Sequence, residues 1–448
     1  MRGYISSLLV ISVVLKLCYG FVHPIAIHGR YFIDTVTREP FFVKGVDYQP
    51  GGSSAVNEQQ DPLSDPNACA RDIILFQELG VNTIRVYSIN PDLNHDHCMT
   101  LLASAGIYLV LDVNSPLENQ HLNRYEPWTT YNEDYLEHVF KVIEQFSSYN
   151  NTLGFFAGNE IINDKKSARA SPVFVKKLIS DMKTYIAQHS PRFVPVGYSA
   201  ADDLSYRISL SKYLECSNER SIQDAVDFYG VNTYQWCGEQ TFYTSGYDVL
   251  VADYEDYVRP VFFSEFGCNE VTPRLFEEIG TIYSNDMIGV FSGGLVYEFS
   301  QEPNNYGLVE INQYGNVELL QDFESLKNQY ATTDVPNGRQ VAELYNRDGK
   351  KQKLGAQAIP ECDEEYDNLD ISKTVDEGIA EDLIKEGVDS KKGKYVVLQE
   401  DDFYTSYNIT NVDGTPFSGD KYVKVTTLID GITEYEALRL QALESDGE

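Results

Sequence analysis

The stretch Gly154-Phe155-Phe156-Ala157-Gly158-Asn159-Glu160 decides how the rest of this sequence is interpreted. It is a run of small and aromatic apolar residues that ends in an amide and a carboxylate, a pattern typical of a buried strand. The pattern recurs in Val261-Phe262-Phe263-Ser264-Glu265-Phe266-Gly267. Active sites of parallel barrels are built where the strands end. Two buried strands that each deliver one Glu therefore indicate glycoside chemistry.

Short apolar runs like these two occur along most of the chain and alternate with helical patterns. We predict eight strands, at residues 41–46, 82–87, 107–113, 154–160, 192–198, 226–234, 261–266 and 294–299. Apolar periodicity predicts helices at residues 67–79, 101–105, 134–146, 172–189 and 273–283. Such alternation implies βαβ units with a parallel sheet, and the count of eight predicts a (β/α)8 TIM barrel.

The character of the chain changes after the last predicted strand, which suggests the following organisation. We predict a signal peptide at 1–20, a catalytic domain at 21–330, a polar linker at 331–361, a small β-rich appendage at 362–433 and a polar tail at 434–448 that is a candidate for disorder. The strands expected in the appendage are the alternating segments at 395–398 and 422–425.

Composition and charge exclude several classes of partner. The chain of 448 residues has a formal net charge of −33, which argues against nucleic acid and against anionic membrane surfaces. Its 32 Tyr suit sugar binding, although core packing accounts equally simply for most of them. We expect a monomer.

The amino-terminal sequence predicts secretion. A basic start, a short apolar stretch and small residues near Gly20 are typical of a cleaved signal peptide. Six cysteines remain, which favours disulfides over a metal site, because no CxxC pair is present. Asn150 and Asn408 begin N-glycosylation sequons. The C-terminus is polar and does not support a GPI anchor, so we expect export to the cell surface or wall, with the chain either released, truncated as given, or anchored by other means.

The paired glutamates predict the reaction type. A retaining glycosidase needs one carboxyl as acid/base and a second as nucleophile, about 5–5.5 Å apart. Glu160 and Glu265 end predicted strands 4 and 7, which place them at the mouth of the barrel. Asn159 precedes the acid and could bind the sugar 2-hydroxyl. The simpler interpretation of either Glu alone is a surface carboxylate. Carboxylates suffice for this acid/base chemistry, and no metal or organic cofactor is expected.

The sequence resembles the fungal β-1,3-glucanosyltransferases of glycoside hydrolase family 72 from about residue 22 to 330. The resemblance is carried by six segments in order: VKGVDYQPGG (43–52), IRVY (84–87), AGNE (157–160), YGVNTYQWC (229–237), FSEFGC (263–268) and VYEFSQE (296–302). It implies a retaining enzyme that cleaves an internal β-1,3-glucan bond. The new reducing end would then be joined to the non-reducing end of a second β-1,3-glucan, elongating wall glucan.

The resemblance also assigns roles to individual residues. Glu160 would be the proton donor and Glu265 the nucleophile, with Asn159 holding the donor sugar. Further residues that would bind the glucan are Tyr87, Asn114, Ser115, Pro116, Leu117, Glu118, Asn119, Gln120, His121, Leu122, Asp202, Arg207 and Tyr297, with weaker indications for Gln49, Asp112, Tyr234 and Tyr306. From physics alone, each tyrosine could simply pack, and Asp202 could simply pair with Arg207.

The cysteines follow the family as well. The resemblance implies the pairs Cys69–Cys98, Cys237–Cys268 and Cys216–Cys362, whereas six cysteines by themselves allow about 15 pairings. Two alternatives to the transferase remain open at this point. One is an endo-β-1,3-glucanase, in which water replaces the acceptor glucan. The other is a non-catalytic glucan-binding protein of the wall.

Overall fold

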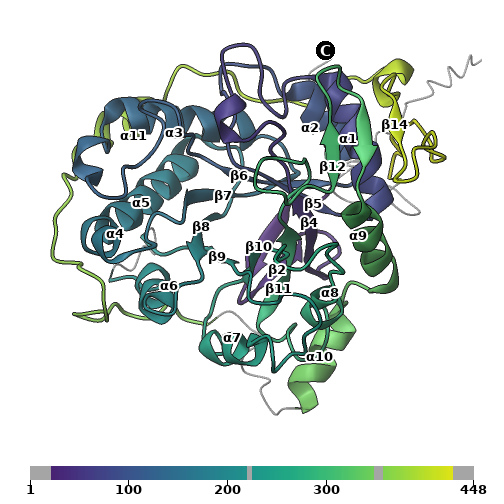
Figure 1. Cartoon of the computed structure of the whole chain (residues 1–448). Coiled ribbons are helices and arrows are strands. Elements are labelled where there is room, and N and C mark those ends of the chain that lie inside the picture. Colours follow the sequence, from purple (N-terminus) through teal and green to yellow (C-terminus); the bar gives the residue numbers. More distant parts are fainter. Residues whose placement is uncertain (1–21, 219–223, 348–356, 427–448) are drawn as a thin grey trace, which may run out of the picture.

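A closed barrel of eight parallel strands forms the centre of the computed structural model, which describes residues 22–218, 224–347 and 357–426 (Figure 1). Around the barrel the strands follow the order β10-β11-β4-β5-β6-β7-β8-β9. The predicted TIM barrel is therefore confirmed. The strands are β1 (Ile25–His28), β2 (Tyr31–Asp34), β3 (Pro40–Phe41), β4 (Val43–Asp47), β5 (Thr83–Val86), β6 (Tyr108–Asp112), β7 (Thr152–Asn159), β8 (Val196–Ala201), β9 (Phe228–Asn232), β10 (Val261–Phe266), β11 (Phe291–Val296), β12 (Val309–Ile311), β13 (Val317–Leu319) and β14 (Ile409–Thr410).

Helices cover the outside of the barrel (Figure 1). They are α1 (Pro66–Leu79), α2 (Asp96–Ser104), α3 (Glu133–Phe146), α4 (Lys165–Ala170), α5 (Pro172–His189), α6 (Arg207–Glu215), α7 (Tyr247–Asp253), α8 (Glu278–Ile282), α9 (Gln321–Thr332), α10 (Gly338–Arg347) and α11 (Glu381–Glu386). Short 3-10 helices lie at Ser53–Ala55, Pro127–Thr129 and Glu400–Phe403. None of the described helices is both long enough and apolar enough to cross a membrane.

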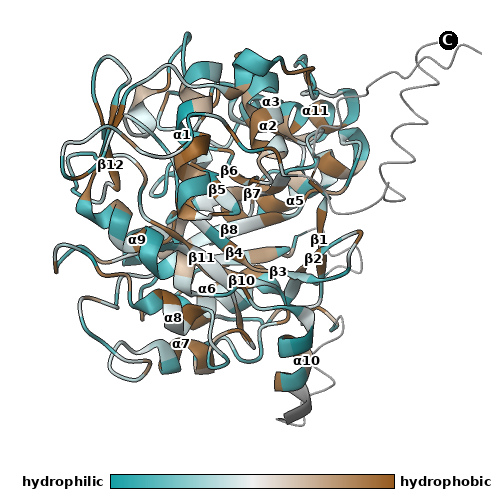
Figure 2. Cartoon of the chain, turned by 90° about the vertical axis from the view of Figure 1, so that its right-hand side faces the viewer, coloured by the Kyte–Doolittle hydropathy of each residue, from teal (hydrophilic) through white to brown (hydrophobic). Residues whose placement is uncertain are grey.

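Local sequence explains where the main helices begin and end. Asp65 accepts hydrogen bonds from the first free backbone N–H groups of α1, and Gly80 ends that helix in the left-handed conformation. Asn132 caps α3 in the same way. Figure 2 shows white to brown strands inside a shell of helices that carry much of the teal surface, as expected for amphipathic helices packed on a buried sheet.

The amino-terminal end of the barrel is closed by the β1–β2 hairpin. Phe32 of this hairpin is fully buried and packs against Phe228 and Phe262, with ring centroids 5.7 and 5.9 Å away. Space there is tight, since a Cβ added to Gly197 would lie 2.4 Å from the Phe228 ring. The apolar plug leaves only the opposite, carboxyl-terminal end of the barrel open for a site.

Two elements of the barrel domain, one strand and one helix, differ in extent from the sequence prediction. The predicted strand at 192–198 is shifted to β8 (Val196–Ala201), because Pro195 has no N–H to donate to a neighbouring strand. The predicted helix at 273–283 is reduced to α8, because Phe276 has a φ of 53°, outside the right-handed helical region.

The chain beyond the barrel also differs from expectation. The range 331–361, expected to be a polar linker, contains α10, whose Val341 and Leu344 are buried. Neither 395–398 nor 422–425 is a strand in the described structure, because Tyr422 forms only an isolated bridge with Tyr404 and some of the other backbone N–H groups bond to side chains. Val396 N donates to Thr100 Oγ1, for example, and Lys424 N to Gln77 Oε1.

The C-terminal segment nevertheless contributes to a small sheet and to the core. β14 pairs in parallel with β13, which forms an antiparallel pair with β12. The segment at 357–426 runs along the outside of the molecule past α5, α3 and α1 (Figure 1). The predicted signal peptide at 1–20 and tail at 434–448 lie outside the described residues.

Candidate active site

Glu265 on β10 is buried at the open end of the barrel and receives hydrogen bonds from several side chains. Its Oε1 accepts from the Tyr87 hydroxyl at 2.8 Å and from Arg85 Nη1 at 3.3 Å, while its Oε2 accepts from the Tyr234 hydroxyl at 2.6 Å. All of these partners donate hydrogen bonds to the carboxyl group of Glu265, which when ionised can only accept hydrogen bonds. The arrangement suits an ionised carboxylate held in one fixed orientation.

The pKa of Glu265 reflects opposing influences. Burial raises the pKa above its ordinary value, and the positive charge of Arg85 lowers it. The neighbouring Glu160 raises it, whereas the hydrogen bonds from Tyr234 and Tyr87 lower it. Burial also raises the pKa values of both tyrosines well above their ordinary value, so they remain neutral donors.

Arg85 of β5 lies across the interior of the barrel and connects several strands. Its guanidinium makes a bidentate ion pair with Asp112 of β6, at 3.1 and 2.9 Å, and donates to Ser264 O at 3.1 Å. Asp112, predicted to contact sugar, is therefore mainly the partner of Arg85, although it also lines a cavity. Arg85 itself was missed as a site residue because its sequence context shows only a strand.

Glu160 follows the end of β7 and is half-buried. Its φ of 48° is in the left-handed region, which costs roughly 1 kcal/mol for a residue with a side chain. Two hydrogen bonds hold it there: its backbone N donates to Ser199 O at 2.9 Å, and its Oε1 accepts from Asn232 Nδ2 at 2.9 Å. Neighbouring strands therefore fix both its backbone and its carboxyl group.

Asn232 joins the two predicted residues of strand 4. Its amide nitrogen donates to Asn159 Oδ1 at 3.0 Å as well as to Glu160, and its oxygen accepts from Ser264 Oγ at 2.7 Å. Sequence reasoning missed Asn232, although its position at the end of the sixth strand is a usable signal. It ties the ends of β7, β9 and β10 together beneath the two carboxyl groups.

Four tyrosines surround the nucleophile candidate in edge-to-face contact. Tyr297 packs against Tyr87 and Tyr234, with centroids 6.3 Å away in both cases, and against Tyr306 at 5.2 Å. Tyr234 also contacts Tyr306 at 5.6 Å. These contacts fix the rings that border the site.

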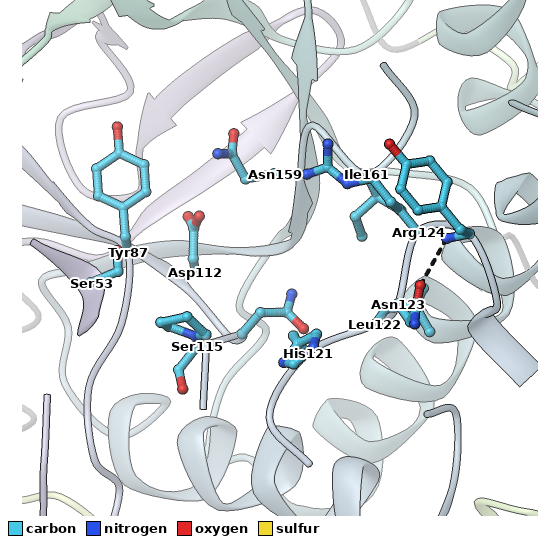
Figure 3. A pocket seen from close by; sticks show the side chains of 13 residues that line it. Ser53, Tyr87, Asp112, Ser115, His121, Leu122, Asn123, Arg124, Asn159 and Ile161 are labelled. Atoms are coloured by element: carbon cyan, nitrogen blue, oxygen red, sulfur yellow. Dashed lines mark hydrogen bonds between the residues drawn. The ribbon is translucent and has the colours of Figure 1, made fainter. Parts of the chain in front are cut away.

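Two cavities open beside the carboxyl groups, and they share Ser53, Tyr87 and Asn159. The first, about 640 Å³, extends toward the loop after β6 (Figure 3). The second, about 600 Å³, contains Glu160 and Glu265 and extends toward the loop after β11. Together they form a cleft that runs to both sides of the catalytic candidates, as a chain-like substrate requires.

The predicted loop at 114–122 lines the first cavity only in part. Figure 3 shows Ser115, His121 and Leu122 at its wall, and Asn114 and Pro116 also line it. Leu117, Glu118, Asn119 and Gln120 do not line either cavity. The loop is held by its own hydrogen bonds, including one from Ser115 Oγ to Gln120 Oε1 at 2.6 Å. Both amide atoms of Asn114 are engaged by Ala157 O and the Tyr135 hydroxyl.

Other predicted residues have mainly structural contacts. Gln49 lines the second cavity, but its Oε1 accepts from the backbone N–H groups of Tyr87 and Ser88. Arg207 pairs with Asp202 at 2.6 Å and with Asp253 at 2.8 Å. Neither Arg207 nor Asp202 lines the two cavities. Lining residues that the sequence did not suggest are Gly51, Gly52, Ser53, Ser54, Asn123, Arg124, Tyr125, Ile161, Glu298, Glu302, Pro303 and Asn304.

The structure contains the disulfides Cys69–Cys98, Cys216–Cys362 and Cys237–Cys268, the three pairs that the resemblance implies. Among described residues, the one close group of possible metal ligands is Cys237, Cys268 and Glu270, and its two sulfur atoms are bonded to each other. Of the two sequon asparagines, Asn408 is exposed and Asn150 is half-buried.

Comparison with known proteins gives a consistent result. The sequence profile of the glucanosyltransferase family matches residues 15–334. The chain is 61% identical to the 1,3-beta-glucanosyltransferase GAS4 of Saccharomyces cerevisiae, over 91% of this chain and 85% of that protein. It is 44% identical to the 1,3-beta-glucanosyltransferase gel2 of Aspergillus fumigatus, over 92% of this chain and 84% of that protein.

Solved structures agree with these sequence matches. A variant of Saccharomyces cerevisiae Gas2p in complex with laminaritetraose and laminaripentaose is 43% identical, with a TM-score of 0.66 over 70% of this chain and 69% of that one. An apo form of Gas2p from the same yeast gives a TM-score of 0.68 at 39% identity, over 78% and 73% of the two chains.

Proposed function

This chain belongs to the glucanosyltransferase family, and we propose that it cleaves β-1,3-glucan and transfers the cleaved segment to a second glucan through Glu265 and Glu160. The observation that carries the proposal is the arrangement of these two carboxyl groups in one cleft. Glu265 is buried and faces three donors, while Glu160 is half-buried and is held by Asn232. The two environments suit two different roles.

In the first step, Glu265 attacks the anomeric carbon of the donor glucan and Glu160 protonates the leaving glycosidic oxygen. The leaving chain takes that proton, and a covalent glycosyl-enzyme forms. In the second step, Glu160 removes a proton from the acceptor hydroxyl, which attacks the anomeric carbon and releases Glu265. The configuration is inverted twice and therefore retained.

The surrounding residues support these steps. Asn159 borders both cavities, and it would hold the donor sugar at the point where they meet. The hydrogen bonds from Tyr87 and Tyr234 favour the ionised form of Glu265 and would keep it oriented. The cavity beside the loop after β6 and the cavity beside the loop after β11 would take the glucan on the two sides of the bond that is cleaved.

The wider context of the reaction also belongs to this proposal. We infer that the chain works as a monomer on one donor and one acceptor glucan in turn. It would act outside the cell on wall glucan, since its three disulfides are typical of oxidising compartments.

The partition between transfer and hydrolysis tests the proposal. We expect incubation with reduced laminarin oligosaccharides to give products both shorter and longer than the substrate, as resolved by mass spectrometry. Shorter products alone would mean that water is the acceptor and that the chain is an endo-β-1,3-glucanase. Glu265→Gln should lower kcat at least about a thousandfold, because the amide is a poor nucleophile. Full activity in that variant would contradict the mechanism.

A further inference from the structure

Asp47 is a buried carboxyl group beneath the site that the proposed mechanism does not use. It ends β4, where it is paired in register with Arg85 of β5, and its side chain is fully buried. In the part of the chain that the structure describes, neither of its carboxyl oxygens has a hydrogen-bond partner. A carboxyl group that is buried without partners is rare and requires an explanation.

The charges that face Asp47 come from four elements. They are Arg85 on β5, Asp112 on β6, Glu265 on β10 and Glu298 after β11. Arg85 is the single cation of this group. Its hydrogen bonds go to Asp112, Ser264 O and Glu265, and none goes to Asp47. An ionised Asp47 would therefore add a further unpaired negative charge to an already acidic buried cluster.

We propose that Asp47 is a positioning residue that remains a neutral carboxylic acid in the working enzyme. The positive charge of Arg85 is then left to stabilise the nucleophile Glu265 and the carboxylate of Asp112. This inference rests on the nucleophilic role proposed for Glu265. A neutral Asp47 fills the space beside the guanidinium without competing for its positive charge. Burial and the nearby carboxylates act in the same direction, since both raise the pKa of Asp47.

The neutral variants Asp47→Asn and Asp47→Leu test the inference, because Asn has about the volume of Asp and Leu keeps the branched shape without a polar atom. We expect both to keep kcat within about tenfold of the unsubstituted chain below neutral pH, with KM nearly unchanged. The matched change Asp112→Asn removes the ionised partner of Arg85 and should lower kcat at least about a hundredfold. A loss of that size in both folded Asp47 variants would overturn the inference, as would the failure of both to fold.

A spectroscopic readout separates this inference from the proposed function. The infrared spectrum of the unsubstituted chain near neutral pH should contain a protonated carboxyl band that is absent from Asp47→Asn. Loss of a carboxylate band instead would show that Asp47 is ionised and would overturn the inference. The infrared result does not depend on whether the chain transfers glucan or hydrolyses it. In turn, the products of the oligosaccharide assay do not depend on the protonation state of Asp47.

Discussion

Tyr234 shows how one hydroxyl group can set the state of the proposed nucleophile. Its hydroxyl donates to Glu265 Oε2 at 2.6 Å and lowers the pKa of that carboxyl group. The ring is held by edge-to-face contacts with Tyr297 and Tyr306, so the hydroxyl stays aimed at the carboxylate. The sequence suggested Tyr234 only weakly, because a tyrosine after a strand is as consistent with packing as with a role in the site.

Replacing Tyr234 with Phe should weaken catalysis and change its pH dependence. Loss of a hydrogen bond to a charged group corresponds to roughly 10- to 100-fold in kcat/KM. Because the hydrogen bond lowers the pKa of Glu265, its loss raises that pKa. The nucleophile then ionises only at higher pH, and the acid limb of kcat/KM moves upward. The measurement is kcat/KM across the acid pH range.

Tyr185→Phe provides the control for this experiment. Tyr185 also donates its hydroxyl to a carboxylate, Glu144 Oε1 at 2.8 Å, but it lies on α5 at the outside of the barrel. We expect this variant to keep the acid limb in place. An unchanged acid limb in Tyr234→Phe would show that the hydrogen bond does not control the ionisation of Glu265.

At the scale of elements, two disulfides of nearly equal sequence separation hold different parts of the molecule. Cys237–Cys268 joins the segments after β9 and β10, with a sequence separation of 31 residues. Cys69–Cys98 joins α1 to α2, with a separation of 29. The Cys237 sulfur lies 3.2 Å from the backbone oxygen of Tyr234. The first disulfide therefore holds a segment that carries a site residue, and the second holds only the helical shell.

Serine substitution at both cysteines of each disulfide separates these contributions. Loops of this length predict a loss of about 3 to 4 kcal/mol in the free energy of unfolding for either pair. We expect Cys237→Ser with Cys268→Ser also to lower kcat about tenfold, because Tyr234 loses its support. The pair Cys69→Ser with Cys98→Ser should keep kcat. Urea unfolding measures the stability of each variant, and kcat is measured at conditions below the unfolding transitions of both variants. Equal kcat values would contradict the expectation.

The predictions of helices and strands were wrong where the local sequence pattern competes with longer-range contacts. All eight predicted strands occur, because burial on both faces leaves a continuous apolar signal. The sequence of α10 is typical of a linker because few of its residues are apolar, yet Val341 and Leu344 suffice to pack one face. The alternating segments at 395–398 and 422–425 have the period of strands. In the described structure they do not extend into strands, because Val396 N and Lys424 N donate to side chains and Tyr422 forms only an isolated bridge with Tyr404.

At the scale of the whole molecule, the segment at 357–426 is part of the same core as the barrel. Its residues Tyr366, Ala380, Leu398, Ile409 and Val423 are buried, and β14 completes the sheet begun by β12 and β13. Tyr395 donates to Asn151 Oδ1 at 2.8 Å beside the start of β7. The segment therefore stabilises the helical shell from outside.

Truncation before residue 357 should accordingly destabilise the barrel. Exposing the apolar surface that these side chains cover corresponds to a loss of at least about 3 kcal/mol in the free energy of unfolding. Urea unfolding followed by tryptophan fluorescence measures it. The control is the variant Cys216→Ser with Cys362→Ser, which keeps the segment at 357–426 and removes only its covalent link to the barrel. An equally stable truncated chain would show that the segment is a mere attachment.

Stability should also depend on pH through buried carboxyl groups. Burial raises the pKa values of Glu215, Glu278 and Glu298 to about 7. The folded chain then binds these protons more tightly than the unfolded chain. The contribution of these groups to the free energy of unfolding is therefore fully present below about pH 4.5. It is lost as the pH rises through about 7, by up to about 3 kcal/mol for each group. Tm measured across this range should fall.

Glu215→Gln with Glu278→Gln tests the origin of that fall. Both residues lie outside the two cavities, so the double variant leaves the proposed site intact. We expect its Tm to fall less steeply with pH than that of the unsubstituted chain. An identical slope would assign the effect to general repulsion, which the net charge of −33 also produces.

The sequence by itself determined the barrel and the two glutamates at its mouth. Buried strands and amphipathic helices leave local signals, and a charged residue at the end of an apolar run is visible without any structure. Tertiary structure decided which side chains meet. Asn232 reaches Glu160 across 72 residues, and Arg85 reaches Glu265 across 180. Among the described residues the Asp47 carboxyl has no hydrogen-bond partner, and its register neighbour Arg85 donates to Asp112 and Glu265 instead. Such contacts depend on strand register and barrel closure, which no local pattern encodes.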